Sequence, residues 1–178
     1  QIADSWIRSG LYKHVLVIGA EVHSTGLDIS TRGRDVTVIF GDGAAATIFG
    51  PTDNDEEGVL ATHVGADGHY ARELWVEAPA SGEMPRLTSE MMEQGRHFPK
   101  MNGREVFKHA VRKFPETVQV SLGMANKSLE DIDLFIPHQA NLRIIEAITK
   151  RIEIPEERVF VNLHKYGNTS AAACAIAL

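Results

Sequence analysis

Two short polar runs hold the residues of this sequence that are best suited to chemistry. The first, PHQAN at 137–141, follows an apolar run at 132–136, and the second, GNTSAA at 167–172, follows another apolar run. Each is followed by helix-forming sequence, so His138 and Asn168 are predicted at strand-to-helix junctions, where open α/β folds place ligands. A His and an Asn side by side can both donate hydrogen bonds to one carbonyl oxygen while negative charge builds on it.

The residues before position 65 predict one helix and several strands. The pattern at 1–9 is an amphipathic helix, and the continuous apolar run at 14–20 is typical of a strand that is buried on both faces. The runs at 36–40 and 44–49, joined by Gly-Asp-Gly, predict a strand, a tight turn and a second strand. A further short strand is expected at 59–64.

The rest of the chain alternates helical and strand patterns. The region 65–99 is irregular, with Trp75 in a possible short strand, and loops of this length are usually functional. Apolar residues at helical spacing predict a helix over 103–125, which Pro115 should kink or divide, and another over 141–152. Alternating strands and helices favour a parallel arrangement in this half. The predicted class is therefore α/β with a mixed sheet.

Composition narrows the functional classes. The chain is 43% hydrophobic, which supports a folded core, and it has no apolar stretch near the roughly 20 residues that span a bilayer. A net charge of −6 argues against a general nucleic-acid binder. The single cysteine, Cys174, fits a reducing compartment, so a cytoplasmic location is expected. Both ends fall inside apparent helices, so we expect a fragment of a longer protein.

Four motifs in fixed order resemble one known family. They are FGDGAAA at 40–46, KMNGREVFK at 100–108, PHQANLR at 137–143 and GNTSAA at 167–172. Together they are similar to β-ketoacyl-[acyl-carrier-protein] synthase III, the condensing enzyme that starts bacterial fatty-acid synthesis. The resemblance covers nearly the whole chain, and the last two motifs are its most specific part.

The resemblance implies a thiolase-like fold, built from two similar mixed-sheet halves with helices in layers. Residues 1–65 would be the end of the first half, 66–99 a connecting and substrate loop region, and 100–178 most of the second half. The family uses a Cys-His-Asn triad, and its cysteine is expected upstream of Gln1. Cys174 is not expected to replace it, since it lies beyond the Asn in an Ala-rich helix.

The resemblance also implies a decarboxylative Claisen condensation of malonyl-acyl-carrier-protein with an acyl-CoA primer. His138 and Asn168 would bind the malonyl thioester oxygen and stabilise the enolate that forms when carbon dioxide leaves. Losing one such donor typically costs on the order of 100- to 1000-fold in rate. An Asn cannot exchange protons, so Asn168 can only orient and donate. The isolated segment is expected to be inactive without the cysteine.

Three further residues match substrate-binding positions of the family. Asn141 would contact the phosphopantetheine arm, although an Asn that opens a helix is also a common N-cap. Phe107 would line the tunnel for that arm, although apolar helix residues are more often core. Arg32, or in another register Arg34, would contact the nucleotide of coenzyme A.

Basic side chains gather on two predicted helices of this acidic chain. Lys108, Arg143, Lys150 and Arg151 match family positions near the tunnel mouth, and Arg143 and Lys150 share a helix face. Complementary charge speeds docking, and carrier proteins are strongly acidic. The sequence therefore predicts a docking surface for acyl carrier protein.

The expected partners are acyl carrier protein, acyl-CoA and a second copy of the full-length protein, with no nucleic acid and no membrane. Beyond the CoA- and phosphopantetheine-linked substrates no cofactor is expected, and the histidines show no metal-ligand pattern. Two alternatives stay open. One is a related enzyme with the same triad, a type III polyketide synthase or a hydroxymethylglutaryl-CoA synthase. The other is a non-catalytic thiolase-fold partner.

Overall fold

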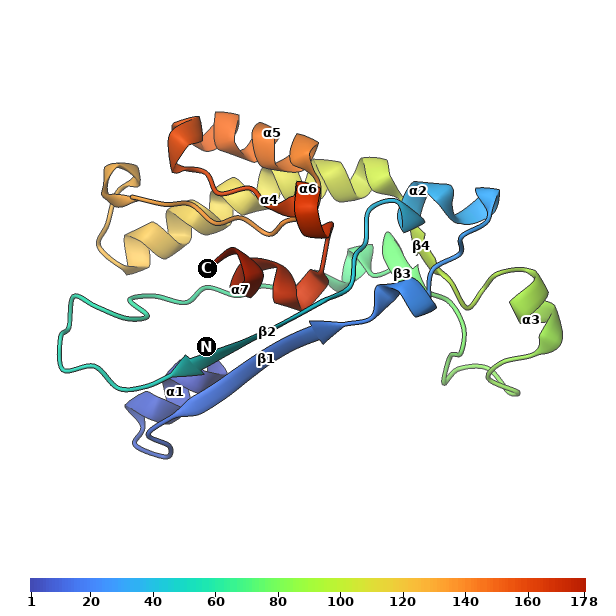
Figure 1. Ribbon diagram of the computed structural model, residues 1–178, viewed down its shortest axis with the longest axis horizontal. Coiled ribbons are helices and arrows are strands. Elements are labelled where there is room, and N and C mark those ends of the chain that lie inside the picture. Colours follow the sequence, from blue (N-terminus) through green and yellow to red (C-terminus); the bar gives the residue numbers. More distant parts are fainter.

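The computed structural model describes residues 1–178, and Figure 1 shows its elements. The helices are α1 (Ile2–Arg8), α2 (Arg34–Thr37), α3 (Ser89–Glu93), α4 (Gly103–Met124), α5 (Leu142–Ile152), α6 (Leu163–Tyr166) and α7 (Ala173–Ala177). The strands are β1 (Val15–Glu21), β2 (Gly43–Phe49), β3 (Leu74–Val76) and β4 (Pro99–Met101). Six short 3-10 turns are η1 (His23–Thr25), η2 (Thr31–Gly33), η3 (Gly68–Tyr70), η4 (Leu129–Asp131), η5 (Glu156–Arg158) and η6 (Ser170–Ala172).

A long two-stranded ribbon and a pair of packed helices form the two main parts of the molecule. The ribbon is β1 and β2, which are antiparallel from Val15 opposite Phe49 to Glu21 opposite Gly43. Helices α4 and α5 lie against each other, and α7 packs on β2 between the two parts (Figure 1). Strands β3 and β4, which come later in the chain, form a second and smaller antiparallel ribbon. None of the helices combines the length and apolar character that crossing a bilayer requires.

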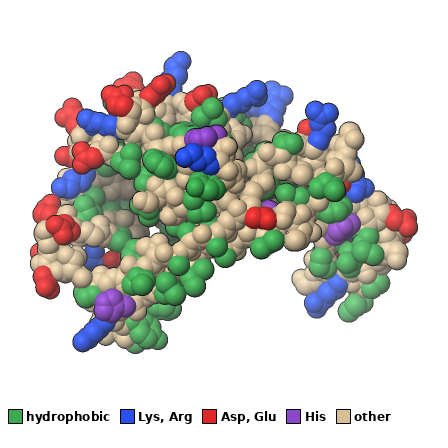
Figure 2. Space-filling view, in the orientation of Figure 1, with side chains coloured by type: hydrophobic (Ala, Val, Ile, Leu, Met, Phe, Trp, Pro, Cys, Tyr) green, Lys and Arg blue, Asp and Glu red, His purple; other side chains and the backbone are tan.

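The strand predicted at 14–20 is confirmed, but its burial on both faces is wrong. Leu16, Val17 and Ile18 are all exposed in this chain, as is Ile48 of the partner strand. Figure 2 shows apolar side chains gathered along this part of the surface. Neighbouring side chains of a strand point to opposite faces, so neither face of the two-stranded sheet is fully covered in this part of β1.

The strand–turn–strand predicted over 36–49 is wrong in its first half. The chain forms the helical turn α2 there, with Val36 buried, and β2 pairs with β1 instead. Thr37 Oγ1 donates to the backbone oxygen of Asp28 at 2.7 Å, which holds the segment in a turn. Periodicity alone does not separate a short buried strand from a buried helical turn. Of this run only Phe40 makes a β-bridge, to Asn168.

The irregular region has more structure than its sequence indicates. Trp75 does lie in a short strand, β3, as predicted, and β3 pairs with β4. The strand predicted at 59–64 does not form. The region also contains η3 and α3, which the sequence does not predict.

Helix α4 continues through Pro115, so the predicted division of this helix is wrong. A proline inside a helix costs about 3 kcal/mol because it removes a hydrogen bond and crowds the preceding turn. Pro115 is buried, and α4 packs along α5, so tertiary contacts offset that cost. Asn102 caps the N-terminus of α4 through the N–H of Glu105.

The core lies between α4 and α5. Four buried isoleucines, Ile144, Ile148, Ile152 and Ile154, form its centre. The apolar side chains packed around them are Phe107, Ala110, Phe114, Leu129, Ile132, Phe135, Ala140 and Val159. The helical spacing predicted for 141–152 thus places one face of α5 in the core.

The two apolar runs that precede the polar motifs lie side by side. Phe135 and Val159 form a parallel bridge, with Phe135 donating to the oxygen of Arg158 at 2.7 Å and Phe160 donating to the oxygen of Phe135 at 3.0 Å. The parallel arrangement predicted for this half is confirmed, although each run makes one bridge rather than a full strand.

Replacing a central core side chain should destabilise this chain strongly. Ile148 is 1% exposed, so Ile148→Ala leaves a cavity, and changes of this kind cost roughly 2–5 kcal/mol of unfolding free energy. The control is Ile29→Ala, because Ile29 is 89% exposed and should change the unfolding free energy by less than about 0.5 kcal/mol. Urea denaturation followed by circular dichroism measures both. Equal losses in the two variants would contradict the assigned core.

Candidate active site

Asn168 is fixed by backbone hydrogen bonds on both sides. Helix α6 ends at Gly167, whose φ of +67° is readily available only to glycine. The N–H of Asn168 then donates to the oxygen of Ile39 at 2.9 Å, and its own oxygen accepts from Gly41 N–H at 3.0 Å. The residue is 8% exposed. Its backbone therefore has very little freedom to move.

The Asn168 side chain is oriented by the turn that follows. Its Oδ1 accepts the backbone N–H of Ser170 at 2.9 Å. Because Oδ1 is engaged in this way, the Nδ2 amide group is the end of the side chain left to bind something else. Nδ2 has no hydrogen-bond partner and is not sealed from solvent. Asn168 thus presents a donor, as the sequence predicts.

His138 is half-buried, three residues after the bridged Phe135. Burial lowers the pKa of its imidazole below the ordinary value of 6.5, so the ring is neutral near pH 7. Neither ring nitrogen has a protein partner, and neither is sealed from solvent. A neutral imidazole donates through one nitrogen. His138 can therefore act as an uncharged hydrogen-bond donor.

Gln139 connects the two polar runs, and it is 1% exposed. Its Nε2 donates to the oxygens of Pro137 (2.9 Å) and Phe160 (3.2 Å), and its Oε1 accepts from Asn162 N–H at 2.9 Å. The segment that carries His138 is thereby tied to the segment that leads into α6. No hydrogen bond joins the His138 and Asn168 side chains. That both side chains donate to one substrate oxygen therefore stays a prediction.

Asn141 caps α5, as its position predicts. Its Oδ1 accepts the N–H of Ile144 at 3.1 Å. Its Nδ2 has no partner and is not sealed from solvent, so a contact with a phosphopantetheine arm stays a prediction. Phe107 packs against the isoleucine core, which agrees with the ordinary role of an apolar helix residue. Its place in a tunnel also stays a prediction.

Arg32 is held by Asp28. Its Nε donates to Asp28 Oδ2 at 2.6 Å, and its Nη1 donates to the oxygen of Glu93 at 3.1 Å. Hydrogen bonds from Ser30 and Arg32 lower the pKa of Asp28 to about 2. Arg34 is exposed at the start of α2. Which of the two arginines meets a nucleotide stays a prediction.

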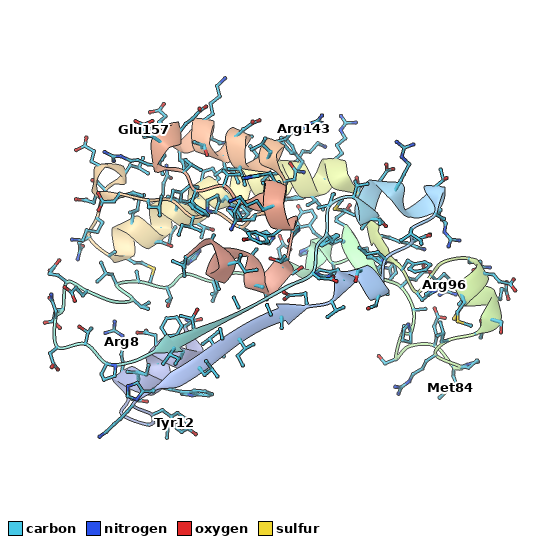
Figure 3. The ribbon with its side chains drawn as sticks, in the orientation of Figure 1. Arg8, Tyr12, Met84, Arg96, Arg143 and Glu157 are labelled. Atoms are coloured by element: carbon cyan, nitrogen blue, oxygen red, sulfur yellow. The ribbon has the colours of Figure 1, made fainter.

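The predicted docking cations differ in their surroundings. Lys108 forms an exposed ion pair with Glu105 at 2.6 Å. Arg143, Lys150 and Arg151 are exposed on α5 and form no ion pair. Figure 3 shows Arg143 at the outer surface of α5, and Figure 2 shows acidic side chains mixed with basic ones along that edge.

Cys174 lies in α7, where burial raises the pKa of its thiol. A raised thiol pKa leaves little thiolate, which is the reactive form. The expectation that Cys174 does not serve as the nucleophile agrees with this environment.

Two functional candidates could not be singled out from the sequence. Glu21 and His23, at the end of β1, hydrogen-bond to the residues that follow Asn168. They lie about 150 positions away from that turn, and no local motif pairs them with it. Only the tertiary contact between β1 and η6 reveals them.

His138 follows the bridged Phe135, and Asn168 follows α6 and forms a bridge with Phe40, in an α/β chain that matches thiolase-fold structures. Two family models match it: 3-oxoacyl-[acyl-carrier-protein] synthase III over residues 1–68, and the C-terminal part of the same family over residues 122–178. Together these matches cover more than half of the chain. The chain belongs to the β-ketoacyl-[acyl-carrier-protein] synthase III family.

Relatives and solved structures agree over nearly the whole chain. The β-ketoacyl-[acyl-carrier-protein] synthase III of Natranaerobius thermophilus is 45% identical over 100% of this chain and 54% of its own length. That of Clostridioides difficile is 46% identical over 99% of this chain and 52% of its own. The crystal structure of the Thermus thermophilus enzyme matches with a TM-score of 0.86 at 40% identity, over 99% of this chain and 52% of that one. The chain therefore spans about half the length of the relatives it matches.

The burial of His138 makes a pH-dependent contribution to stability. Its folded-state pKa is lowered, so below about pH 6.5 the unfolded chain binds a proton that the folded chain resists. The unfolding free energy should therefore fall as pH drops through and below 6.5, and His138→Gln should remove part of this fall. Urea titrations of both proteins at pH 8.0 and 5.5 measure it, since other groups cancel in the difference. Identical pH slopes would contradict the buried neutral ring.

Proposed function

We propose that this chain is the part of a decarboxylating condensing enzyme that stabilises the enolate of malonyl-acyl-carrier-protein. The observation that carries the proposal is the free Nδ2 donor of Asn168, which the turn orients and the backbone fixes. A neutral, accessible His138 supports it. Preorganised donors of this kind stabilise charge that develops on a thioester oxygen.

The proposed mechanism divides the reaction between two steps. A cysteine of the full-length protein first accepts the acyl group from acyl-CoA. The malonyl thioester then loses carbon dioxide, and the electron pair of the broken C–C bond moves into the enolate, whose oxygen accepts from His138 and Asn168. The enolate carbon attacks the acyl-cysteine carbonyl, a C–C bond forms, and the cysteine thiolate leaves. The thioester itself provides the electron sink, so no resident cofactor is needed.

Removing either donor should slow decarboxylation strongly but leave acylation nearly unchanged. In the full-length protein that carries this segment, His138→Ala or Asn168→Ala should lower malonyl decarboxylation by on the order of 100- to 1000-fold, because each removes a hydrogen bond to the enolate oxygen. Release of labelled carbon dioxide measures this step. Acyl transfer from acyl-CoA to the enzyme, followed by mass spectrometry, is the control and should stay within about 2-fold. Unchanged decarboxylation in both variants would remove the assigned roles.

The carrier protein is proposed to dock on the exposed cations of α5. Arg143, Lys150 and Arg151 have no ion-pair partner in the chain, so an acidic partner does not have to displace one. Lys108 sits on the neighbouring helix, where it is already paired with Glu105. The cations of α5 are therefore the stronger part of the proposed surface. The phosphopantetheine arm would then pass near Asn141 at the start of this helix.

Charge reversal on α5 should affect the carrier-linked substrate alone. Arg143→Glu with Lys150→Glu should raise the KM for malonyl-carrier protein on the order of 10-fold and leave malonyl-CoA kinetics unchanged, because only the carrier meets this face. The difference should shrink at 1 M salt, where the screening length is about 3 Å. Lys13→Glu, an exposed cation before β1, is the control. Equal effects on both substrates, or none at low salt, would argue against docking here.

The remaining features of the proposed enzyme follow the family. The full-length protein is proposed to be a cytoplasmic homodimer, with the boundaries near 65 and 100 separating its two halves from a substrate loop. The single free cysteine is consistent with a reducing compartment.

A further inference from the structure

Glu21 holds the backbone just after the Asn168 turn. Its two carboxylate oxygens accept the N–H groups of Ala171 at 2.9 Å and Ala172 at 3.2 Å. The strand lies so close that a Cβ on Gly19 would stand 2.8 Å from the carbonyl carbon of Ala171. This approach lets the carboxylate of the last β1 residue reach the start of η6.

His23 contacts Ser170, the residue just before Ala171 in the same turn. Its Nε2 lies 2.9 Å from Ser170 Oγ, and its ring stacks at a tilt on Phe40, with centroids 5.0 Å apart. Phe40 is also the bridge partner of Asn168. Ser170 has a φ of +45°, which is strained for a residue with a side chain, so its neighbours must hold it there.

The strained turn matters because it sets the direction of the Asn168 amide. The N–H of Ser170 reaches Asn168 Oδ1 only while the turn keeps this backbone conformation. His23 and Glu21 hold residues 170–172, which follow that N–H directly. If these residues were released, the peptide between Thr169 and Ser170 would be free to turn, and the amide would be free to rotate or flip. The free Nδ2 donor would then lose its fixed direction, although the backbone of Asn168 would stay bridged to Phe40.

We propose that Glu21 and His23 are positioning residues for Asn168: they hold the strained turn that aims its amide at the developing enolate oxygen. The inference rests on the proposed role of Asn168 and deepens it. Neither side chain needs to touch the substrate. Their removal should therefore lower the rate of the decarboxylation step while substrate binding and acyl transfer to the cysteine stay intact.

The test uses the full-length protein that carries this segment. Glu21→Ala and His23→Ala should each lower kcat for malonyl decarboxylation by about 10-fold, with KM and acyl transfer within about 2-fold. Glu21→Gln, which keeps one acceptor oxygen, should recover part of the loss. Asp131→Ala is the matched control, because that carboxylate also accepts a backbone N–H, from Ser128 at 2.7 Å, far from the Asn168 turn. It should leave kcat within about 2-fold.

Two results would overturn the inference. One is wild-type kcat in both alanine variants. The other is an equal loss in Glu21→Ala and Asp131→Ala, which would mean that general destabilisation is responsible. If Glu21→Ala does not fold, Ser170→Ala is the second variant, because it deletes only the hydroxyl that contacts His23. It should give the same selective loss in kcat. An unchanged kcat in Ser170→Ala would also overturn the inference.

The proposed function and the positioning role fail in different ways. If Asn168→Ala is inactive but the Glu21 and His23 variants are fully active, the positioning role alone is wrong. If Asn168→Ala decarboxylates normally, both proposals are wrong. Amide hydrogen exchange adds a direct readout on the protein itself: Ala171 should be protected and should lose that protection in Glu21→Ala, whereas Ala172, which also donates to the oxygen of Thr169 at 3.0 Å, should stay protected. Unprotected amides in the unaltered protein would contradict the geometry.

Discussion

The close crossing of β1 over the 168–172 turn is the constraint on which the candidate site depends. Residues from opposite ends of the chain meet there without side chains between them, because Gly19 leaves no Cβ to separate the strand from Ala171. The same crossing brings Glu21 to the N–H groups of Ala171 and Ala172 in the turn. On the other side, Gly41 approaches Tyr166 so closely that any side chain at position 41 would collide with its carbonyl oxygen. Backbone-to-backbone contact fixes the site more firmly than flexible side chains could.

The sequence predicts some neighbouring elements correctly and others wrongly. His138 and Asn168 were predicted after apolar runs, and those runs do lie in parallel as expected. The run at 36–40 misled because its pattern suits a buried strand and a buried helical turn equally, and a hydrogen bond from Thr37 to Asp28 decided between them. Long-range contacts of this kind leave no local periodicity. The contacts of Glu21 could not be predicted from the sequence for the same reason.

Burial was the property least accessible to prediction. The run at 14–20 has the composition of a strand covered on both faces, yet Leu16 and Ile18 are exposed in a ribbon of two strands. The composition of a strand shows that it could be buried between two layers. Its actual exposure depends on which other elements pack against the sheet. The helix predicted over 141–152 does bury one face, because its partner α4 lies in the same chain and packs directly on it.

In each of the two motifs, most residues serve to position a single hydrogen-bond donor. In PHQAN, Gln139 satisfies two carbonyl oxygens and an N–H, and Asn141 caps the helix, whereas the imidazole ring of His138 has no hydrogen bond within the chain. In GNTS, the glycine and serine supply positive φ angles and Thr169 is fully buried, which leaves Nδ2 of Asn168 unpaired. The polar groups of a buried residue normally form hydrogen bonds within the protein. The unpaired, solvent-accessible groups of His138 and Asn168 stand among neighbours whose hydrogen bonds are satisfied, and this contrast is what the proposed function builds on.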